Sequence, residues 1–267
     1  MQTESTSQRI AVTGATGRVG SHLVEVLAQR GHDVAPIARS EGVDVVSGEG
    51  LDEELVGVQT IVDAASGPSP DQDEATAFFT ASARNLQRAG AAAGAKRIVV
   101  VSIIGIDKFD SGYNAAKVVQ EQTLLEGPLP VRIVRAAQFH EFVEPLVSWT
   151  IKDGVAYVPE MRTQLVAARV VAETLADAAE EAEIEHGRIT EVAGPQAERL
   201  AEAAAALFVS RGDSYEIRES RGGLLANPDD RDAAAYADGA ALPNPGAKLA
   251  GPSFEEWLVG ATVSRST

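Results

Sequence analysis

The stretch Ile10–Gly20, which reads IAVTGATGRVG, leads a short apolar run into three glycines spaced three residues apart. Residues 9–13 predict a buried strand, and residues 18–29 predict a helix. The apolar side chains of this helix recur at helical spacing, at Val19, Leu23, Val26 and Leu27. A turn without bulky side chains lets the chain bend sharply and lets another group approach the main chain closely. The stretch therefore predicts a strand, an open turn and a helix in direct succession.

Strands and helices alternate through the first half of the chain. We expect strands over residues 9–13, 32–39, 44–46, 60–66, 97–103 and 131–137. We expect the helices between them over residues 18–29, 52–56, 73–93 and 113–125. Residues 97–103 are almost entirely apolar, as is typical of a strand covered on both faces. This alternation predicts an α/β fold with a doubly wound parallel sheet of the Rossmann type.

The pattern is weaker in the last third of the chain. Its expected elements are a strand or loop at 155–160, helices at 165–181 and 196–207, and a strand at 188–194. We expect residues 141–267 to form a small C-terminal α+β lobe that packs on residues 1–140 to make one compact unit.

The C-terminal residues carry turn and capping signals. Residues 219–252 are rich in Gly, Pro, Asp and Asn, so we expect them to be irregular. Ser253 and Glu256 have the spacing of a capping box, which predicts a short last helix that ends near Val259.

The composition disfavours several classes of protein. The chain has 267 residues, a formal net charge of −16 and no cysteine. A nucleic-acid-binding protein would carry a basic face, and thiolate metal sites need cysteine, so we expect neither. The four histidines lack metal-ligand spacing, so no metal site is expected. Because no apolar run reaches the ~18 residues of a membrane span and the first ten residues are polar, we expect a soluble cytoplasmic protein.

The glycine turn has the chemistry of a pyrophosphate cradle. Gly14 permits the tight turn, Gly17 permits close approach of the main chain to an anion, and Gly20 lets the helix pack against the strand. The N-terminus of the helix adds about half a positive charge. The turn follows a strand and opens a helix within a β-α-β pattern, which is the context that such a motif requires.

The chain resembles the extended and atypical short-chain dehydrogenase/reductases, and the NmrA-like branch most closely. The segments TGATGRVG, KRIVVVSIIG and YNAAK carry the resemblance, which covers residues 8–140 well and extends loosely to ITEVAGP and FEEWL. The resemblance implies a Rossmann domain over residues 1–140 that binds NAD(P), and a substrate-binding part over residues 141–267. The cofactor-binding residues expected on these grounds are Gly14, Thr16, Gly17, Arg18, Val19, Ala64, Ala65 and Ser66, with Arg39 and Lys117 discussed below. Asp63, just before these alanines, fits a structural cap better than a ligand.

The end of the second expected strand bears on the choice of nicotinamide cofactor. In dinucleotide-binding folds, an acidic residue at this place holds the ribose 2′-OH of NAD. This chain has Ala38, Arg39 and Ser40 there, and Arg18 lies within the glycine turn. A guanidinium can hold a 2′-phosphate through charge-assisted hydrogen bonds worth roughly 1.5–3 kcal/mol each. We therefore expect a preference for NADP(H), with NAD(H) possible.

Tyr113 and Lys117 form a pair at helical spacing. Residues four apart share a helix face, and this is the Tyr-x-x-x-Lys arrangement of the resembled superfamily. A nearby ammonium would lower the pKa of the phenol, which could then exchange a proton with a carbonyl oxygen as hydride moves. Lys117 could also hold the nicotinamide ribose. Ser102 is the candidate third catalytic residue, although extended members tend to place this serine where the chain has Ile103 or Ile104.

Other residues are candidates for the substrate pocket. Ala137, Gln138 and Phe139 follow the last strand of the predicted Rossmann domain and should pass the nicotinamide. His140, Trp149, Tyr157 and Met161 fit either a pocket or the core of the small lobe.

The motifs together favour an NADPH-dependent oxidoreductase that transfers hydride to a small carbonyl or quinone-like acceptor. A catalytically silent NAD(P)-binding redox sensor is an alternative, since no serine stands at positions 103 and 104. A nucleotide-sugar epimerase or dehydratase is a third reading, although the C-terminal part looks short for such a substrate. The expected partner is a small-molecule substrate, and the chain is expected to be a monomer or a homodimer.

Overall fold

The computed structural model describes residues 7–183, 185–221 and 232–265. The chain divides into two compact units that alternate along the sequence. The first unit contains residues up to Ser102, residues 112–135 and residues 171–190. The second unit contains residues 103–111, residues 136–170 and residues from Glu191 onward.

The largest sheet has seven strands in the order β12-β9-β5-β4-β3-β1-β2. They are β1 (Arg9–Thr13), β2 (Asp33–Ile37), β3 (Thr60–Asp63), β4 (Arg97–Ile103), β5 (Val131–Ala136), β9 (Ile189–Ala193) and β12 (Lys248–Leu249). β1 pairs in parallel with both β2 and β3, and β3 pairs in parallel with β4. The carboxyl ends of these strands meet at one edge, where open α/β sheets bind their ligands. The predicted doubly wound parallel sheet is confirmed.

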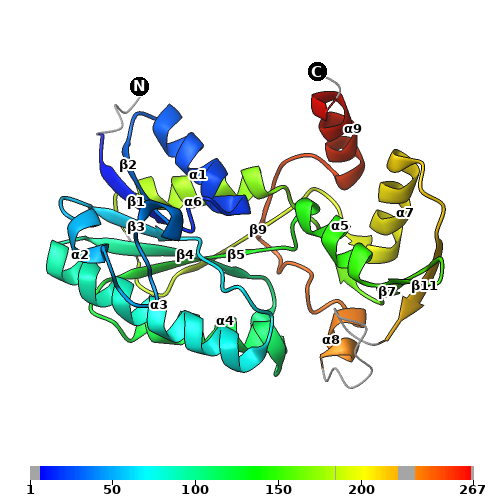
Figure 1. Cartoon of the computed structure of the whole chain (residues 1–267), viewed down its shortest axis with the longest axis horizontal. Helices are drawn as coiled ribbons and strands as arrows, with labels where there is room; N and C mark the ends of the chain where they lie inside the picture. The colour runs from blue at the N-terminus through cyan, green and yellow to red at the C-terminus, as the bar shows by residue number, and fades with distance from the viewer. Residues whose placement is uncertain (1–6, 184, 222–231, 266–267) are drawn as a thin grey trace. The chain divides into compact units, whose positions relative to one another are not determined.

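Helices cover both faces of this sheet (Figure 1). α1 (Arg18–Gln29) and α6 (Ala168–Glu180) lie on one face, and α3 (Gln72–Ala93) and α4 (Gly112–Leu125) lie on the other. A short helix, α2 (Leu51–Glu54), and two 3₁₀ turns, η1 (Arg39–Glu41) and η2 (Ile106–Lys108), complete the elements of residues 7–135. Arg30, just after α1, is tied to α6 through Glu180 at 2.7 Å and Asp177 at 2.9 Å.

Local signals explain where these helices begin and end. The side chain of Asp71 accepts hydrogen bonds from the backbone N–H groups of Asp73 and Glu74, and so caps the start of α3. Gly94 ends α3 in the left-handed conformation, with φ of 79°. The buried residues of α1 include the predicted apolar stripe.

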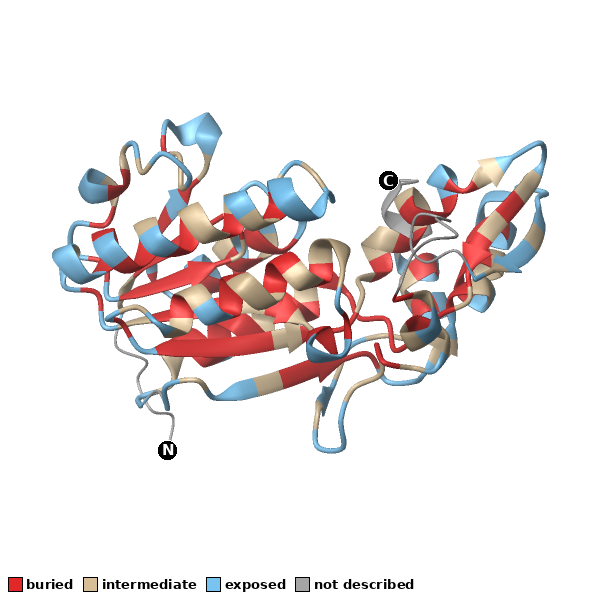
Figure 2. Cartoon of the chain, turned by 90° about the horizontal axis from the view of Figure 1, so that it is seen from below, coloured by how far each residue is buried: buried red, intermediate tan, exposed pale blue. Residues whose placement is uncertain are grey.

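The hydrophobic core of the first unit lies between the sheet and its helices. Figure 2 shows the inner strands of the sheet mostly buried, whereas the helices expose one side. One core cluster joins side chains of the sheet, such as Ile37, Ile61 and Val100, to side chains of α2, α3 and α4, such as Leu51, Leu86 and Leu124. The low aromatic content is matched by close packing of small side chains, including Ala11, Ala35 and Ala83.

The strand predicted over residues 44–46 is wrong. The Asp44 carboxylate accepts hydrogen bonds from the backbone N–H of Val46 at 2.7 Å and of Ser47 at 3.4 Å, which folds the segment into a turn. A strand would have needed these N–H groups for a neighbouring strand. β2 consequently forms the edge of the sheet.

The second unit has small sheets and its own core. Its strands are β6 (Ile151–Lys152), β7 (Val155–Pro159), β8 (Arg162–Thr163), β10 (Glu198–Arg199) and β11 (Glu216–Ser220). Its helices are α5 (His140–Trp149), α7 (Leu200–Arg211), α8 (Ala233–Ala237) and α9 (Phe254–Arg265). β11, β7 and β6 form one sheet, and β10 pairs with β8. Buried residues from α5, α7, α8 and α9 form one cluster with β7, which includes Leu146, Val158, Leu207, Tyr236 and Phe254. This unit mixes helices with small sheets, as an α+β lobe does; it includes residues 103–111 and leaves out residues 171–190.

The C-terminal elements differ in detail from the predictions. The capping box is confirmed, because Ser253 Oγ accepts from the N–H of Glu256 while the Glu256 carboxylate accepts from the N–H of Ser253. α9 nevertheless continues beyond Val259, since a glycine such as Gly260 weakens a helix by about 1 kcal/mol without having to end it. Residues 219–252 are partly regular, because they contain the end of β11, α8 and β12; residues 222–231 lie outside the described residues.

Within the described ranges, no helix combines the length and the apolar character needed to cross a membrane.

Candidate functional site

The glycine turn between β1 and α1 is closed by its own main chain. Gly14 has φ of +64°, and a Cβ there would lie 2.6 Å from the carbonyl oxygen of Ala64. A Cβ at Gly20 would lie 2.0 Å from the carbonyl oxygen of Gly14. Both glycines are therefore required for the packing of the chain itself.

Gly17 differs from the other two glycines. It is exposed, and a Cβ there would meet only the Gly14 carbonyl oxygen, at 3.1 Å. Gly17 is the N-cap of α1; no side chain caps this end, and the first turn holds no acidic residue. The first turn thus presents main-chain N–H groups with no carboxylate in competition for them, as an anion site requires. Thr16 and Arg18 are exposed beside it, and Val19 is buried.

The ends of β2 and β3 flank this turn. Thr13 pairs with Ile37 of β2 and with Asp63 of β3, so the residues that follow these strands lie on either side of Gly14. Ala64, Ala65 and Ser66 follow β3, and the close approach of Ala64 to Gly14 fixes them beside the turn.

Asp63 is a structural residue. Its carboxylate is fully buried and accepts hydrogen bonds from Thr13 Oγ1 at 2.5 Å, from the N–H of Ala65 at 3.2 Å and from Gln120 Nε2 at 2.9 Å. These bonds join β1, β3 and α4, and they hold the turn that carries Ala64 and Ala65. The reading of Asp63 as a cap is confirmed.

Arg39 lies on the other side of the turn, where it begins η1 two residues after β2. Its side chain is exposed, and no residue within the described part of the chain forms an ion pair with it. In a chain with a net charge of −16, Arg18 and Arg39 supply local positive charge at the edge that holds the glycine turn. The open N-terminus of α1 and these two guanidinium groups fit the phosphates of a dinucleotide.

Tyr113 and Lys117 share one face of α4 and contact the same aromatic ring. The ring of Phe79, from α3, packs edge-on against Tyr113 at 5.5 Å, and Lys117 Nζ lies 4.8 Å from its centroid. Tyr113 sits in an apolar cluster with Ala75, Phe79 and Ala116. The predicted common face is confirmed.

Lys117 is buried and bound within the chain. Its ammonium donates hydrogen bonds to the carbonyl oxygen of Val101, at 2.7 Å, and to Gln120 Oε1. Burial lowers the pKa of Lys117 to about 8, against the opposing effect of the Asp63 and Glu121 carboxylates. Within the described ranges, no hydrogen bond joins Lys117 to Tyr113.

The expectation that Lys117 lowers the pKa of Tyr113 is wrong for the chain by itself. Burial, with the Asp63 carboxylate as a second cause, raises the pKa of Tyr113 to about 12. The reason is that the ammonium points toward Val101 and Gln120, while the phenol ring lies among apolar side chains. Tyr113 is therefore a protonated phenol at neutral pH.

Ser102 lies near the end of β4, directly after the residue whose carbonyl binds Lys117. It is buried, and its Oγ has no hydrogen-bond partner among the described residues. A buried hydroxyl without a hydrogen-bond partner is uncommon in folded proteins. Positions 103 and 104 both hold isoleucine, which has no hydroxyl, and Ile104 is fully buried.

The pocket candidates of the second unit have separate environments. Ala137 is buried, and Phe139 is the N-cap of α5. Gln138 Oε1 accepts a hydrogen bond from Thr163 Oγ1 at 2.5 Å. Met161 is buried in the core cluster of this unit, whereas Trp149 is 62% exposed.

His140 is a core residue. It is buried, packs against the rings of Phe254 and Trp257, and has Nε2 3.2 Å from the carbonyl oxygen of Pro252. Burial lowers its pKa to about 4. This environment favours the structural reading of His140 over a role as a proton donor at neutral pH.

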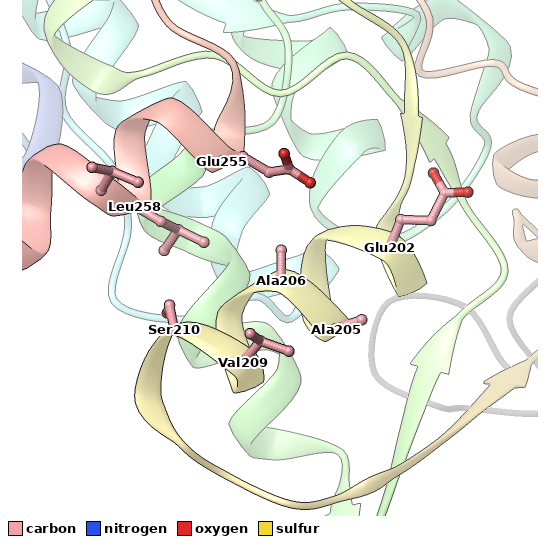
Figure 3. A pocket seen from close by; sticks show the side chains of 8 residues that line it. Glu202, Ala205, Ala206, Val209, Ser210, Glu255 and Leu258 are labelled. Atoms are coloured by element: carbon pink, nitrogen blue, oxygen red, sulfur yellow. The ribbon is translucent and has the colours of Figure 1, made fainter.

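A groove of about 720 Å³ lies between α7 and α9 in the second unit (Figure 3). It is lined by Glu202, Ala205, Ala206, Val209, Ser210, Glu255, Leu258 and Val259. None of the residues predicted to bind cofactor or to act in catalysis lines it.

Sequence reasoning missed Gln120 and Phe79, which surround Lys117. Gln120 stands three residues after Lys117 on the same helix, and this spacing could have indicated a contact. Phe79 lies on a different helix, and no local pattern pointed to it.

A glycine turn that opens the first helix of a parallel, doubly wound sheet defines a dinucleotide-binding protein of the Rossmann class. Residues 14–182 match the family described as NAD(P)H-binding, and the chain belongs to that family. The cofactor class that the resemblance implied is therefore confirmed, since the chain is an NAD(P)H-binding protein.

Curated relatives include a reductase and a dehydrogenase. The chain is 29% identical over 160 residues to 4-hydroxy-tetrahydrodipicolinate reductase of Natronomonas pharaonis, a match to 58% of this chain and 54% of the relative. It is 34% identical over 125 residues to L-arabinose 1-dehydrogenase (NAD(P)(+)) of Haloferax volcanii, a match to 43% of this chain and 48% of the relative. The chain thus spans about half the length of the curated relatives that it matches.

Similar folds occur among solved structures. One is a nucleoside-diphosphate-sugar epimerase (SAV0421) from Staphylococcus aureus, with a TM-score of 0.72 and 16% identity. The alignment covers 94% of this chain and 99% of the epimerase chain.

Proposed function

We propose that the chain is an NADPH-dependent oxidoreductase that transfers hydride to a small carbonyl or quinone-like acceptor. Its place in an NAD(P)H-binding family supports the cofactor class, and its curated relatives are a reductase and a dehydrogenase. The observation that carries the proposal is the occurrence, in one compact unit, of an uncapped glycine turn and the Tyr113/Lys117 pair. The substrate-binding role of residues 141–267 is part of this proposal.

The residues that would hold the cofactor line the carboxyl edge of the sheet. The Gly17 N–H donates to the Gly14 carbonyl oxygen at 2.8 Å, so the main-chain N–H groups of Arg18 and Val19 would bind the pyrophosphate. Ala64 and Ala65 would leave room for the nucleoside. Lys117 and Ser102 would donate hydrogen bonds near the nicotinamide ribose. NADPH, when bound, supplies the hydride and so carries the redox chemistry.

Tyr113 is the proposed proton donor. Its pKa of about 12 keeps the phenol protonated at neutral pH, which is the form needed to protonate an acceptor oxygen during reduction. Lys117 has a pKa of about 8, so its ammonium is present at neutral pH to stabilise negative charge. The apolar cluster around Tyr113 limits water near the phenol.

The proposed preference for NADPH over NADH rests on Arg39, with Arg18 in support. The exposed guanidinium of Arg39 has no described ion-pair partner, and no carboxylate stands between the end of β2 and Glu41. Dinucleotide folds selective for NAD place an acidic residue in this region, which would repel a 2′-phosphate.

Incubation with NADPH and a panel of quinones, ketones and aldehydes tests the proposal. The nicotinamide absorbance should fall with at least one acceptor, and Tyr113→Phe should reduce turnover while NADPH binding persists. Tight NADPH binding without consumption across the panel would overturn the oxidoreductase reading.

A redox sensor that binds the dinucleotide without turnover is the second candidate. One observation favours it: the Lys117 ammonium is bound to Val101 and Gln120 rather than to Tyr113. The lack of a hydroxyl at positions 103 and 104 also favours a redox sensor over an enzyme. NADPH binding with no consumption, and with Tyr113→Phe indistinguishable from the parent chain, would establish this alternative.

A nucleotide-sugar epimerase or dehydratase is a weaker third reading that rests on likeness of fold. Addition of UDP-sugars and NAD, followed by analysis of the sugar products, distinguishes it from the reductase.

A further inference from the structure

Three side chains form a continuous polar chain beneath the carboxyl edge of the sheet. Gln120 Nε2 donates to Asp63 Oδ2 at 2.9 Å, and Gln120 Oε1 accepts from the Lys117 ammonium. Asp63 comes from β3, whereas Gln120 and Lys117 come from α4. All three are buried, with exposures of 0%, 1% and 4%.

Because the three side chains are buried, the loss of any hydrogen bond among them costs free energy of folding. A buried ammonium needs hydrogen-bond acceptors and a compensating negative charge. The acceptors are the Val101 carbonyl and Gln120, and the face of the Phe79 ring covers the ammonium at 4.8 Å. The nearest compensating charge on another element is the Asp63 carboxylate, which reaches the ammonium through the Gln120 amide.

The other charged groups near Lys117 are already paired. Glu121, on the same helix, accepts from Arg135 of β5 at 2.8 Å, so a neighbouring guanidinium balances much of its charge. Tyr113, one turn earlier on α4, is neutral at neutral pH because its pKa is about 12. From α3, the contact with Lys117 is the uncharged ring of Phe79.

We infer that Gln120 is a positioning residue for Lys117, and that it joins the ammonium to the buried Asp63 carboxylate beneath the turn that carries Ala64 and Ala65. This inference rests on the proposed function, in which Lys117 belongs to the reacting pair. The amide has one workable orientation, because its N–H₂ faces a carboxylate and its oxygen faces an ammonium. A side chain of similar size without both groups cannot make this link.

Two substitutions at position 120 separate the link from simple packing. Gln120→Met keeps the length of the side chain but removes both the donor and the acceptor. Gln120→Glu keeps an acceptor for Lys117. Gln122→Met is the matched control, because Gln122 is exposed on the same helix and makes no described side-chain hydrogen bond.

The measurement is the titration of the Lys117 side chain by NMR of the ¹⁵Nζ and ¹³Cε nuclei in lysine-labelled protein. The other lysines are Lys96, Lys108, Lys152 and Lys248, and Lys117→Met assigns the signal. The Lys117 pKa should begin near 8. Gln120→Met should lower it by about one to two pH units, the equivalent of one charge-assisted hydrogen bond. Gln120→Glu should keep the Lys117 pKa at its parent value or raise it, and Gln122→Met should leave the Lys117 pKa unchanged.

An unchanged Lys117 pKa in a folded Gln120→Met protein would overturn the inference. If Gln120→Met does not fold, Gln120→Glu decides the matter, because a Lys117 pKa below that of the parent chain would then contradict the link.

The NMR result does not depend on turnover, so the positioning role of Gln120 and the oxidoreductase proposal can be refuted independently of each other. A shifted Lys117 pKa in a protein that consumes no NADPH leaves the positioning role intact and removes the oxidoreductase proposal. Where turnover exists, the pH at which it declines should follow the Lys117 pKa across the variants, and a purely structural role would not produce this correlation.

Discussion

Replacement of Gly17 by alanine adds one methyl group at the place where a dinucleotide phosphate is proposed to meet the main chain. The surrounding chain tolerates this methyl group, because it meets only one backbone atom, the Gly14 carbonyl oxygen at 3.1 Å. Alanine is a poorer N-cap than glycine, so the expected loss of stability is about 1 kcal/mol or less. For a chain of this length that corresponds to a fall in Tm below about 4 °C.

The expected loss of NADPH affinity is larger. A methyl group that holds the phosphate away from the N–H groups removes at least one charge-assisted hydrogen bond, worth roughly 1.5–3 kcal/mol. The dissociation constant should therefore rise about 10-fold to 100-fold. Nicotinamide fluorescence titration gives the affinity, and thermal unfolding gives the stability of the same samples.

Two further glycines provide the controls. Gly20→Ala would put a methyl carbon 2.0 Å from the Gly14 carbonyl oxygen, so this variant should lose roughly 1–3 kcal/mol of stability whether or not NADPH binds. Gly260→Ala meets no atom within 4 Å and should leave NADPH affinity unchanged. If Gly17→Ala binds NADPH as tightly as the parent chain, the reasoning about this turn is refuted.

Arg39→Ala should reduce the preference for NADPH over NADH by about tenfold or more, since one guanidinium–phosphate hydrogen bond is worth roughly 1.5–3 kcal/mol; an unchanged ratio of dissociation constants would remove Arg39 from the cofactor site. Tyr113→Phe should lower turnover about 10²- to 10⁴-fold while NADPH affinity stays within error, and full activity of this variant would exclude the phenol as proton donor. Because the Lys117 ammonium is lost as pH rises through about 8, steady-state turnover should decline above that pH, and a flat profile up to pH 10 would argue against a charged Lys117. The folded-state pKa of His140, about 4, lies below its ordinary value of 6.5, so the unfolded chain binds a proton first as pH falls. The free energy of unfolding should therefore fall by roughly 3 kcal/mol between pH 6.5 and pH 4 at this site, and denaturant unfolding of His140→Gln should show a shallower dependence.

The sequence predicted the fold where the local signal and the tertiary environment agreed. The helix after the glycine turn and the strand over residues 97–103 have the predicted bounds, because apolar periodicity and burial on the sheet specify the same residues. The strand prediction for residues 44–46 failed because it rested on apolar Val45 and Val46. The Asp44 carboxylate accepts the hydrogen bonds of backbone N–H groups that a strand would use.

The candidate site could be predicted only as far as its contacts are local. The glycine turn and the Tyr113/Lys117 spacing lie within short segments, and the sequence displays them directly. The surroundings of Lys117 depend on Asp63, which lies 57 residues before Gln120, and on Phe79 of another helix. No local pattern contains these contacts, so neither the high pKa of Tyr113 nor the bound ammonium of Lys117 could be predicted from the sequence.

The central claim is that the main-chain amides at the N-terminus of α1, which no side chain caps, bind the two linked phosphates of a nicotinamide dinucleotide. NMR of protein labelled with ¹⁵N-glycine, titrated with NADPH, tests it most directly. The Gly17 amide signal should shift with saturation at a single site, while the signal of Gly94, at the end of α3, should stay in place. The claim would be contradicted if no glycine signal of the turn moved at millimolar NADPH, NADH or their oxidised forms.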